Sequence, residues 1–296
     1  MAPPNTTVSF FDCATPGTLP VINNSAVRLA VLASLLLKCK VNKVSAFDRK
    51  HYFYSDLPHG YQITQQRLPI AEAGEVQIPG SSVHVQRVQL EMDSGKMLHD
   101  RHAFASLVNL NRAGMALIEI VSAPDMSNGV QAAAYAKKVQ QLLRHVSPSF
   151  GDIAVLFVIH QFSQVGVCDG NMEEGSFRVD VNVSVHEAGE PLGARCEVKN
   201  LNSFKSISRA IDFESERQRG LLSRGLPVLP ETRLFNAVTG QTVKMRNKDS
   251  MWDYRFMPDP DIPALHVNTL SDRVCVPSIL QLILFRYRMD LLSLCA

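Results

Sequence analysis

The sequence feature that most constrains the fold is a strict alternation of apolar and polar side chains from Phe177 to His186. Successive side chains of an extended strand point to opposite faces, so this pattern predicts a half-buried strand. The alternation returns from Ala194 to Lys199, after the turn residues E-A-G-E-P, and predicts an antiparallel hairpin with one charged face. The polar side chains of that face are Arg178, Asp180, Asn182, Ser184, His186, Arg195, Glu197 and Lys199.

The remaining segments mix helical and extended patterns. Helices are predicted where an asparagine or serine that can cap a helix precedes a periodic apolar stretch, and strands where short apolar or aromatic runs lie between turn residues. This mixture predicts an α/β (α+β) fold built on a mixed, largely antiparallel sheet. The helices are expected from Asn24 to about Lys40, from Asn128 to about Arg144 and from Asn202 or Ser203 to Gly225, and strands within 47–65, 83–90, 116–121 and after 228.

Composition narrows the class of protein. With 46% apolar residues, the 296-residue chain can fill a large core. Its net charge of +2 excludes a protein built to coat nucleic acid, so any RNA contact is local. The six cysteines have no metal-binding or disulfide spacing, which favours reduced thiols. No transit peptide is visible, and the apolar runs 29–37 and 274–285 are shorter than the roughly 20 residues that span a bilayer, so we expect no membrane partner.

Carboxylates adjoin the charged hairpin face. Glu173 and Glu174 precede it, and acids beside basic residues suit magnesium and phosphate chemistry. A solvated sheet face with no chemical role explains the same residues about equally well. The chain has no G-x-x-x-x-G-K-[ST] phosphate loop and no G-x-S-x-G or Ser-Lys amidase signature. Glutamine hydrolysis would therefore need another protein.

Glu119 and Lys50 are candidate functional residues because of the sequence around them. Glu119 lies in the apolar run L-I-E-I-V, where a charge costs free energy unless a metal, a base or water interacts with it. Lys50 lies in F-D-R-K-H-Y-F-Y, where the aromatic side chains either stack on nucleotides or belong to the core, and the core is favoured. The histidines have no metal-ligand spacing.

Five segments carry a resemblance to a known family. In chain order they are F-D-R-K-H-Y-F-Y-S-D-L-P-H-G-Y-Q-I, N-R-A-G-M-A-L-I-E-I-V-S-A-P-D-M, M-E-E-G-S-F-R-V-D-V-N-V-S-V, E-V-K-N-L-N-S-F and D-Y-R-F-M-P-D-P-D-I-P. Together they resemble the B subunit of the glutamyl-tRNA(Gln) amidotransferase. The resemblance implies a cradle-like catalytic domain over 1–266, with an insertion at 145–164 and a divergent tail at 267–296. E-M-D-S-G-K and H-E-A-G-E-P-L-G resemble the mitochondrial form, which implies the mitochondrial matrix.

The resemblance also implies an activity. In that family, the B subunit is a ligase that uses ATP and Mg²⁺ to phosphorylate the glutamate on Glu-tRNA(Gln), then amidates it. The ammonia comes from glutamine hydrolysed by the A subunit, a glutaminase, and a small C subunit completes the complex. Phosphoryl transfer to a carboxylate requires metal ions and positive groups around the phosphate rather than a protein nucleophile.

Residue by residue, Glu119 matches a family metal-binding acid and Lys50 a lysine near the mouth of the ammonia path. The family's second glutamate falls on Met92, so Glu91 or Asp93 is the expected substitute. Family members usually open with a strand resembling G-L-E-V-H-V-Q-L, and this chain begins after it, so a non-catalytic scaffold stays open as an alternative. The predicted sites are catalytic Glu119, Lys50, Glu173, Glu174 and Asp180; nucleotide-binding Arg178, Asn182, Arg195 and Lys199; and metal-binding Glu119, Glu91 and Asp93.

Overall fold

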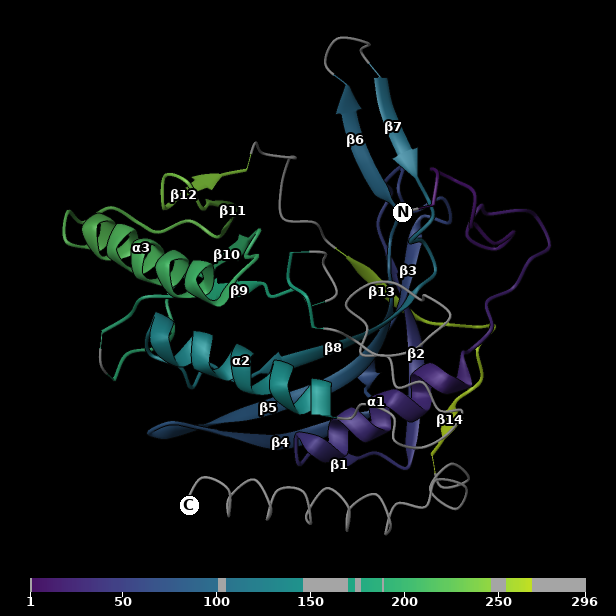
Figure 1. The fold of residues 1–296 in the computed structure, drawn as a ribbon, viewed down its shortest axis with the longest axis horizontal. Helices are drawn as coiled ribbons and strands as arrows, with labels where there is room; N and C mark the ends of the chain where they lie inside the picture. The colour runs from purple at the N-terminus through teal and green to yellow at the C-terminus, as the bar shows by residue number, and fades with distance from the viewer. Residues whose placement is uncertain are drawn as a thin grey trace.

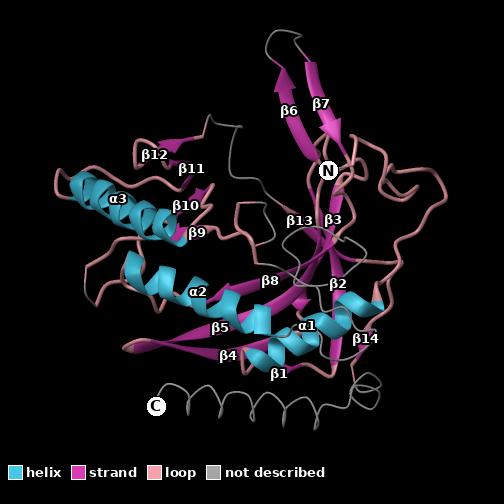
Figure 2. Cartoon of the chain, in the orientation of Figure 1, coloured by secondary structure: helices cyan, strands magenta, loops and turns pink. Residues whose placement is uncertain are grey.

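The computed structural model describes residues 2–100, 105–145, 170–173, 177–187, 189–245 and 254–267. These residues form three helices and several largely antiparallel sheets, which confirms the predicted α+β class (Figure 2). Residues 146–164 of the predicted insertion and 268–296 of the predicted tail lie outside the described residues. None of the described helices is long and apolar enough to cross a membrane.

The main sheet has the strand order β1-β4-β5-β8, and every pair in it is antiparallel. Helices α1 and α2 cover one of its faces (Figure 1). Buried side chains of α1 and of β5 belong to the same hydrophobic core. The bounds are β1 Lys40–Val41, β4 Ala71–Ile78, β5 Ser81–Met92, β8 Ala116–Ser122, α1 Asn24–Leu36 and α2 Gly129–His145.

Helix α1 differs from its prediction at both ends. Its cap is Asn23 rather than Asn24, because the Asn23 side chain accepts hydrogen bonds from the backbone N–H groups of Ser25 and Ala26. The helix ends at Leu36, because Lys38 adopts a left-handed conformation with φ +56°. The predicted cap of α2 is confirmed, since Asn128 Oδ1 accepts a hydrogen bond from the N–H of Gln131.

A second sheet is built around β2. Strand β2 pairs with β3 on one side and, on the other, with two short strands from the end of the described chain, β13 and β14. A bulge interrupts the β2–β3 pairing, and the buried Asp48 carboxylate accepts the N–H groups of Gln66 and Arg67 there. The bounds are β2 Val44–His51, β3 Tyr61–Leu68, β13 Arg255–Pro258 and β14 Leu265–His266.

A third sheet has the order β12-β11-β10-β9 and packs against α3, which in turn packs against α2 (Figure 1). Strands β9 and β10 pair antiparallel, which confirms the predicted hairpin, whereas β10 and β11 run parallel. The Ser203 side chain caps α3, as predicted. The bounds are β9 Val181–Val183, β10 Cys196–Lys199, β11 Glu231–Asn236, β12 Gln241–Lys244 and α3 Phe204–Leu222.

The predicted strand from Phe177 to His186 is wrong in length, because only β9 pairs as a strand. After Val183 the cause is α3: Gln218 accepts a hydrogen bond from the Val185 N–H and donates one to the Val183 carbonyl, which replaces further strand pairing there. A separate hairpin of β6 (Lys96–Asp100) and β7 (Ala105–Asn109) projects from the body of the molecule (Figure 1).

Candidate functional site

The most concentrated polar interior lies where β5 and β8 meet β3. Gln89 and Glu91 alternate along β5, and Glu119 on β8 lies directly opposite Gln89. Strand β3 packs against β5 and contributes the buried side chains of Gln62 and Thr64. These five residues, together with Lys50, are called the acidic cluster below.

Neutral side chains fix the two carboxylates of the acidic cluster. Gln62 Nε2 donates to Glu91 Oε1 at 2.6 Å and to the Met92 carbonyl at 2.6 Å. Thr64 Oγ1 donates to Glu91 Oε2 at 3.3 Å and accepts from Gln89 Nε2 at 3.2 Å. Gln89 Nε2 also donates to Glu119 Oε2 at 2.8 Å. A continuous hydrogen-bonded chain therefore links both acids across three strands.

The electrostatics of the acidic cluster favour a bound cation. Burial and the neighbouring Glu119 carboxylate raise the pKa of Glu91 to about 7, while the positive charge of Lys50 acts in the opposite direction. Two carboxylates this close do not both ionise readily without a compensating charge. Gln89 Oε1 is buried and has no hydrogen-bond partner. The cluster thus offers two carboxylates and a spare amide oxygen.

Lys50 reaches the acidic cluster from β2, where it lies opposite Gln62. Its Nζ lies 4.7 Å from the ring centroid of Tyr254, and that ring also meets Tyr52 edge-on at 5.9 Å. The preference for core aromatics in this segment holds for Tyr52, which packs against the core, and is wrong for Phe53, whose exposed fraction is 83%.

Asp93 lies two residues beyond Glu91 but has different partners. Its buried carboxylate accepts hydrogen bonds from Arg112 Nη2 at 2.9 Å and from Arg178 Nη2 at 3.3 Å. Within the part of the chain that the structure describes, no three His, Cys, Asp or Glu side chains group as metal ligands. Of the three predicted metal ligands, the structure therefore brings together Glu91 and Glu119.

Arg112 was not among the predicted site residues. The only signal in the sequence is its place in the N-R-A-G-M segment.

The predicted residues on the β9–β10 hairpin are not part of the acidic cluster, and some of them contact one another. Lys199 Nζ lies 2.8 Å from Asp180 Oδ2 and 3.1 Å from Glu197 Oε1. Burial opposes the charge of this lysine, but the two carboxylates outweigh it and raise the pKa of Lys199. Asn182 is exposed and lies opposite Glu197, and Arg195 is exposed. Asp180, Glu197 and Lys199 are called the hairpin trio below.

Of the two predicted glutamates before the hairpin, the structure describes only Glu173. Glu173 is exposed, and Glu174 lies outside the described residues.

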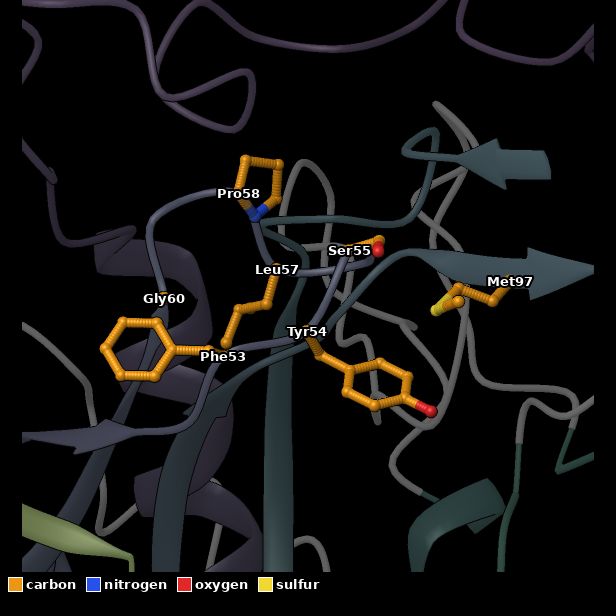
Figure 3. Close-up of a pocket in the computed structure, with 7 residues that line it drawn as sticks. All are labelled: Phe53, Tyr54, Ser55, Leu57, Pro58, Gly60 and Met97. Carbon is orange, nitrogen blue, oxygen red and sulfur yellow. The ribbon is translucent and has the colours of Figure 1, made fainter. Parts of the chain in front are cut away.

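A surface pocket of about 620 Å³ lies in the loop after β2, at the base of the β6–β7 hairpin. Figure 3 shows Phe53 beside Gly60 and the Tyr54 ring on the side of Met97. None of the acidic cluster lines this pocket, and its wall carries no charged side chain. The pocket therefore offers no ionisable carboxylate or amine of the kind that the acidic cluster contains.

Comparison with known proteins identifies the family. The family model described as the GatB/GatE catalytic domain matches residues 1–155 and 154–271. The chain belongs to the GatB/GatE family. The two matched stretches of this family meet within the segment predicted as an insertion.

Curated relatives agree with this GatB/GatE assignment. The B subunit of the aspartyl/glutamyl-tRNA(Asn/Gln) amidotransferase of Rickettsia bellii is 48% identical over 266 residues, 88% of this chain and 51% of that protein. The mitochondrial B subunits of the glutamyl-tRNA(Gln) amidotransferases of Danio rerio and Homo sapiens are 47% and 46% identical, over 90% and 94% of this chain. They are covered over 46% and 48% of their own length, so the chain spans about half the length of the curated relatives it matches.

Proposed function

We propose that this GatB/GatE-family chain acts as the B subunit of a glutamyl-tRNA(Gln) amidotransferase. In this proposal it converts Glu-tRNA(Gln) to Gln-tRNA(Gln), using ATP, Mg²⁺ and ammonia that the glutaminase A subunit releases from glutamine, within a complex that also holds the C subunit. It is thus a ligase that forms a carbon-nitrogen bond with glutamine as amido donor. The names of the relatives support the tRNA substrate and the multi-subunit setting.

The observation that carries the proposal is the pairing of Glu91 and Glu119. Magnesium is commonly held by one or two carboxylates together with waters and substrate phosphates, so two acids and the unpaired Gln89 Oε1 fit it. When bound there, magnesium would neutralise charge on the transferring phosphate. Because these oxygen ligands are present without Asp93, its engagement with two arginines does not weaken the fit.

The chain's own residues have distinct tasks in this proposal. Gln62 and Thr64 hold the Glu91 carboxylate in one orientation, and Gln89 does the same for Glu119. Lys50 supplies a positive charge that can attract the substrate carboxylate or a phosphate oxygen. Since the pKa of Glu91 lies at about 7, the acid pair can also take up a proton at neutral pH.

Nucleotide binding is proposed on the side of the β9–β10 hairpin. Arg195 suits the phosphates best, because it is exposed. Arg178 is half-exposed, but its guanidinium already contacts the Asp93 carboxylate at 3.3 Å. Lys199 already contacts two carboxylates, which makes it a weaker candidate. Asn182 stays in the proposal as a nucleotide-binding residue, and Glu173 and Glu174 stay as catalytic residues. Asp180 is a weaker catalytic candidate, because its carboxylate pairs with Lys199.

We propose the mitochondrial matrix as the location. Two of the relatives are named as mitochondrial, and the bacterial Rickettsia relatives are about equally similar. The proposal therefore follows the names of the animal relatives and the resemblance of E-M-D-S-G-K and H-E-A-G-E-P-L-G to the mitochondrial form.

The test is reconstitution of the chain with the A and C subunits. We expect Gln-tRNA(Gln) to form from Glu-tRNA(Gln) only when ATP and Mg²⁺ are present, with either glutamine or ammonium chloride as nitrogen donor. The matched pair of variants is Glu119→Gln, which should give no product, and Glu72→Gln, which changes an exposed glutamate on β4 and should leave the rate unchanged.

A non-catalytic scaffold is the second candidate, because Asp93, one of the three predicted metal ligands, is held by Arg112 and Arg178 instead. The scaffold is favoured if the chain binds the glutaminase but yields no product under conditions in which a full-length B subunit is active. Product at a rate near that of the full-length protein would exclude it.

A further inference from the structure

The end of the described chain forms a strap across β2. In this strap, residues 254–262, strand β13 runs antiparallel to β2 and places Phe256 opposite Lys50. Two ion pairs anchor it, from Arg49 to Asp259 at 2.9 Å and to Asp261 at 2.5 Å. A backbone hydrogen bond from Asp259 N–H to the Phe47 carbonyl adds a third attachment. The strap therefore has a fixed place beside the strand that carries Lys50.

Tyr254, at the start of the strap, contacts Lys50 directly. The Lys50 Nζ lies 4.7 Å from the centre of the Tyr254 ring, within the range of a cation–π interaction. The ring is itself braced by Tyr52, which meets it at an interplanar angle of 76°. An ammonium group over a braced ring has a defined location, although the lysine side chain alone has four rotatable bonds.

The two carboxylates of the acidic cluster lie near Lys50 but form no ion pair with it. The positive charge of Lys50 acts on Glu91, so the two groups are close, yet no carboxylate among the described residues lies within ion-pair distance of its Nζ. A lysine beside an acid pair would otherwise be drawn into direct contact with a carboxylate. The ring competes with that contact and keeps the ammonium group near the acidic cluster but available to an anionic substrate.

We propose that Tyr254 is a positioning residue that holds the Lys50 ammonium group at the edge of the acidic cluster. The inference rests on the proposed function, in which Lys50 attracts the substrate carboxylate or phosphate. It adds the strap, which lies far from Lys50 in the sequence, to the parts of the chain that the reaction depends on. It also predicts that the aromatic ring matters and the tyrosine hydroxyl does not.

The direct test is nuclear magnetic resonance on the chain with isotope-labelled lysine, with the Lys50 signal identified through Lys50→Arg. A ring beneath the ammonium group shields the neighbouring methylene protons, so we expect the Lys50 ε-CH₂ signal to be shifted upfield. Tyr254→Phe should keep this shift, and Tyr254→Leu should abolish it. Phe256→Leu is the matched control, because Phe256 lies on the same strand opposite Lys50 and its exposed fraction is 41%, against 40% for Tyr254.

The kinetic test uses the reconstituted complex with ammonium chloride as donor. A cation–π interaction at a half-exposed place is worth about 0.5–1 kcal/mol, so Tyr254→Leu should lower kcat about two- to fivefold. The KM for ATP should stay unchanged, and Tyr254→Phe should restore kcat.

The two tests separate this inference from the proposed function. The Lys50 signal requires no activity, so its loss in Tyr254→Leu alone supports the contact even if the complex makes no product. An unshifted Lys50 signal in the unsubstituted chain would overturn the inference, as would equal effects of Tyr254→Leu and Phe256→Leu. Equal kcat in Tyr254→Leu and the unsubstituted chain, with the complex active, would also overturn it.

Discussion

The acidic cluster and the hairpin trio are both groups of charged side chains on strands, but their charges are balanced differently. In the hairpin trio one lysine meets two acids at 2.8 and 3.1 Å on a partly exposed surface. In the acidic cluster each of two acids accepts hydrogen bonds from neutral side chains, and the ammonium group of the nearby lysine lies over a tyrosine ring. In the hairpin trio the lysine pairs with both acids, whereas in the acidic cluster the two carboxylates have no ion-pair partner and the Gln89 amide oxygen has no hydrogen-bond donor. This imbalance, rather than the number of charges, is the reason for proposing the acidic cluster as the ligand-binding site.

The largest effect should come from removing one acid of the cluster. Glu119→Gln keeps the shape of the side chain but removes the charge that a metal would need, so we expect the rate of Gln-tRNA(Gln) formation to fall at least about a thousandfold, or about 4 kcal/mol. The measurement is product formation in the reconstituted complex. Activity within tenfold of the unsubstituted chain would show that the cluster is not the reacting site.

A buried charge network outside the site should affect stability instead. Glu214 on α3 is fully buried and contacts Arg217 at 2.7 Å, Arg233 at 3.3 Å and Thr242 at 2.9 Å. Removing one partner of a buried ion pair leaves the others uncompensated, so Glu214→Ala should lower the free energy of unfolding by about 3 kcal/mol. The measurement is urea denaturation, with Glu216→Ala on the exposed face of α3 as the control. Equal midpoints for the two variants would contradict the prediction.

The third prediction concerns the pH dependence of magnesium binding. Because the pKa of Glu91 is raised to about 7, protons compete with the metal below neutrality. The apparent affinity for Mg²⁺ should fall about tenfold for each pH unit below 7, or about 1.4 kcal/mol. Isothermal titration at pH 6, 7 and 8 measures it, and Glu91→Gln should remove the dependence. An affinity that is constant from pH 6 to 8 would contradict the raised pKa.

The fourth prediction is that the free energy of unfolding falls as pH rises towards 7, because of the Glu91 carboxyl. The folded pKa of Glu91 lies above its ordinary value, so the folded chain binds the proton more tightly than the unfolded chain. The stabilisation is fully present below the unfolded pKa and is lost as pH rises through about 7. In the absence of metal, Glu91→Gln should flatten the fall in unfolding free energy between pH 5 and 8.

Sequence patterns predicted the elements whose signals are local. Asn128 and Ser203 cap the two later helices as expected, because a cap depends only on residues within one turn. The strand predicted from Phe177 to His186 ends early, at Val183, because Gln218, on a helix later in the chain, binds the Val185 N–H and the Val183 carbonyl. Such competition between side chain and strand is decided by tertiary packing, which alternation does not reveal.

The sequence predicted the charged residues of the acidic cluster but not its uncharged polar residues. Glu119 was conspicuous as an acid in an apolar strand, and Lys50 followed from the family resemblance. Gln62, Thr64 and Gln89 gave no signal, because uncharged polar residues are ordinary in strands. Glu91 and Asp93 were equal candidates, and they differ because β5 ends at Met92. Glu91, on the strand, accepts a hydrogen bond from Gln62, whereas Asp93, beyond its end, accepts from Arg112.

The smallest effect should come from the hairpin trio. Lys199→Met leaves Asp180 and Glu197 without their cation, but the side chain of each of the three is more than a third exposed, so water compensates most of the loss. We expect a decrease in unfolding free energy of no more than about 1 kcal/mol, together with less than about a threefold change in kcat. Urea denaturation and the reconstituted assay measure the two quantities. If the rate instead falls as far as it does in Glu119→Gln, the trio belongs to the reacting site, and a balanced set of charges no longer marks a structural role in this chain.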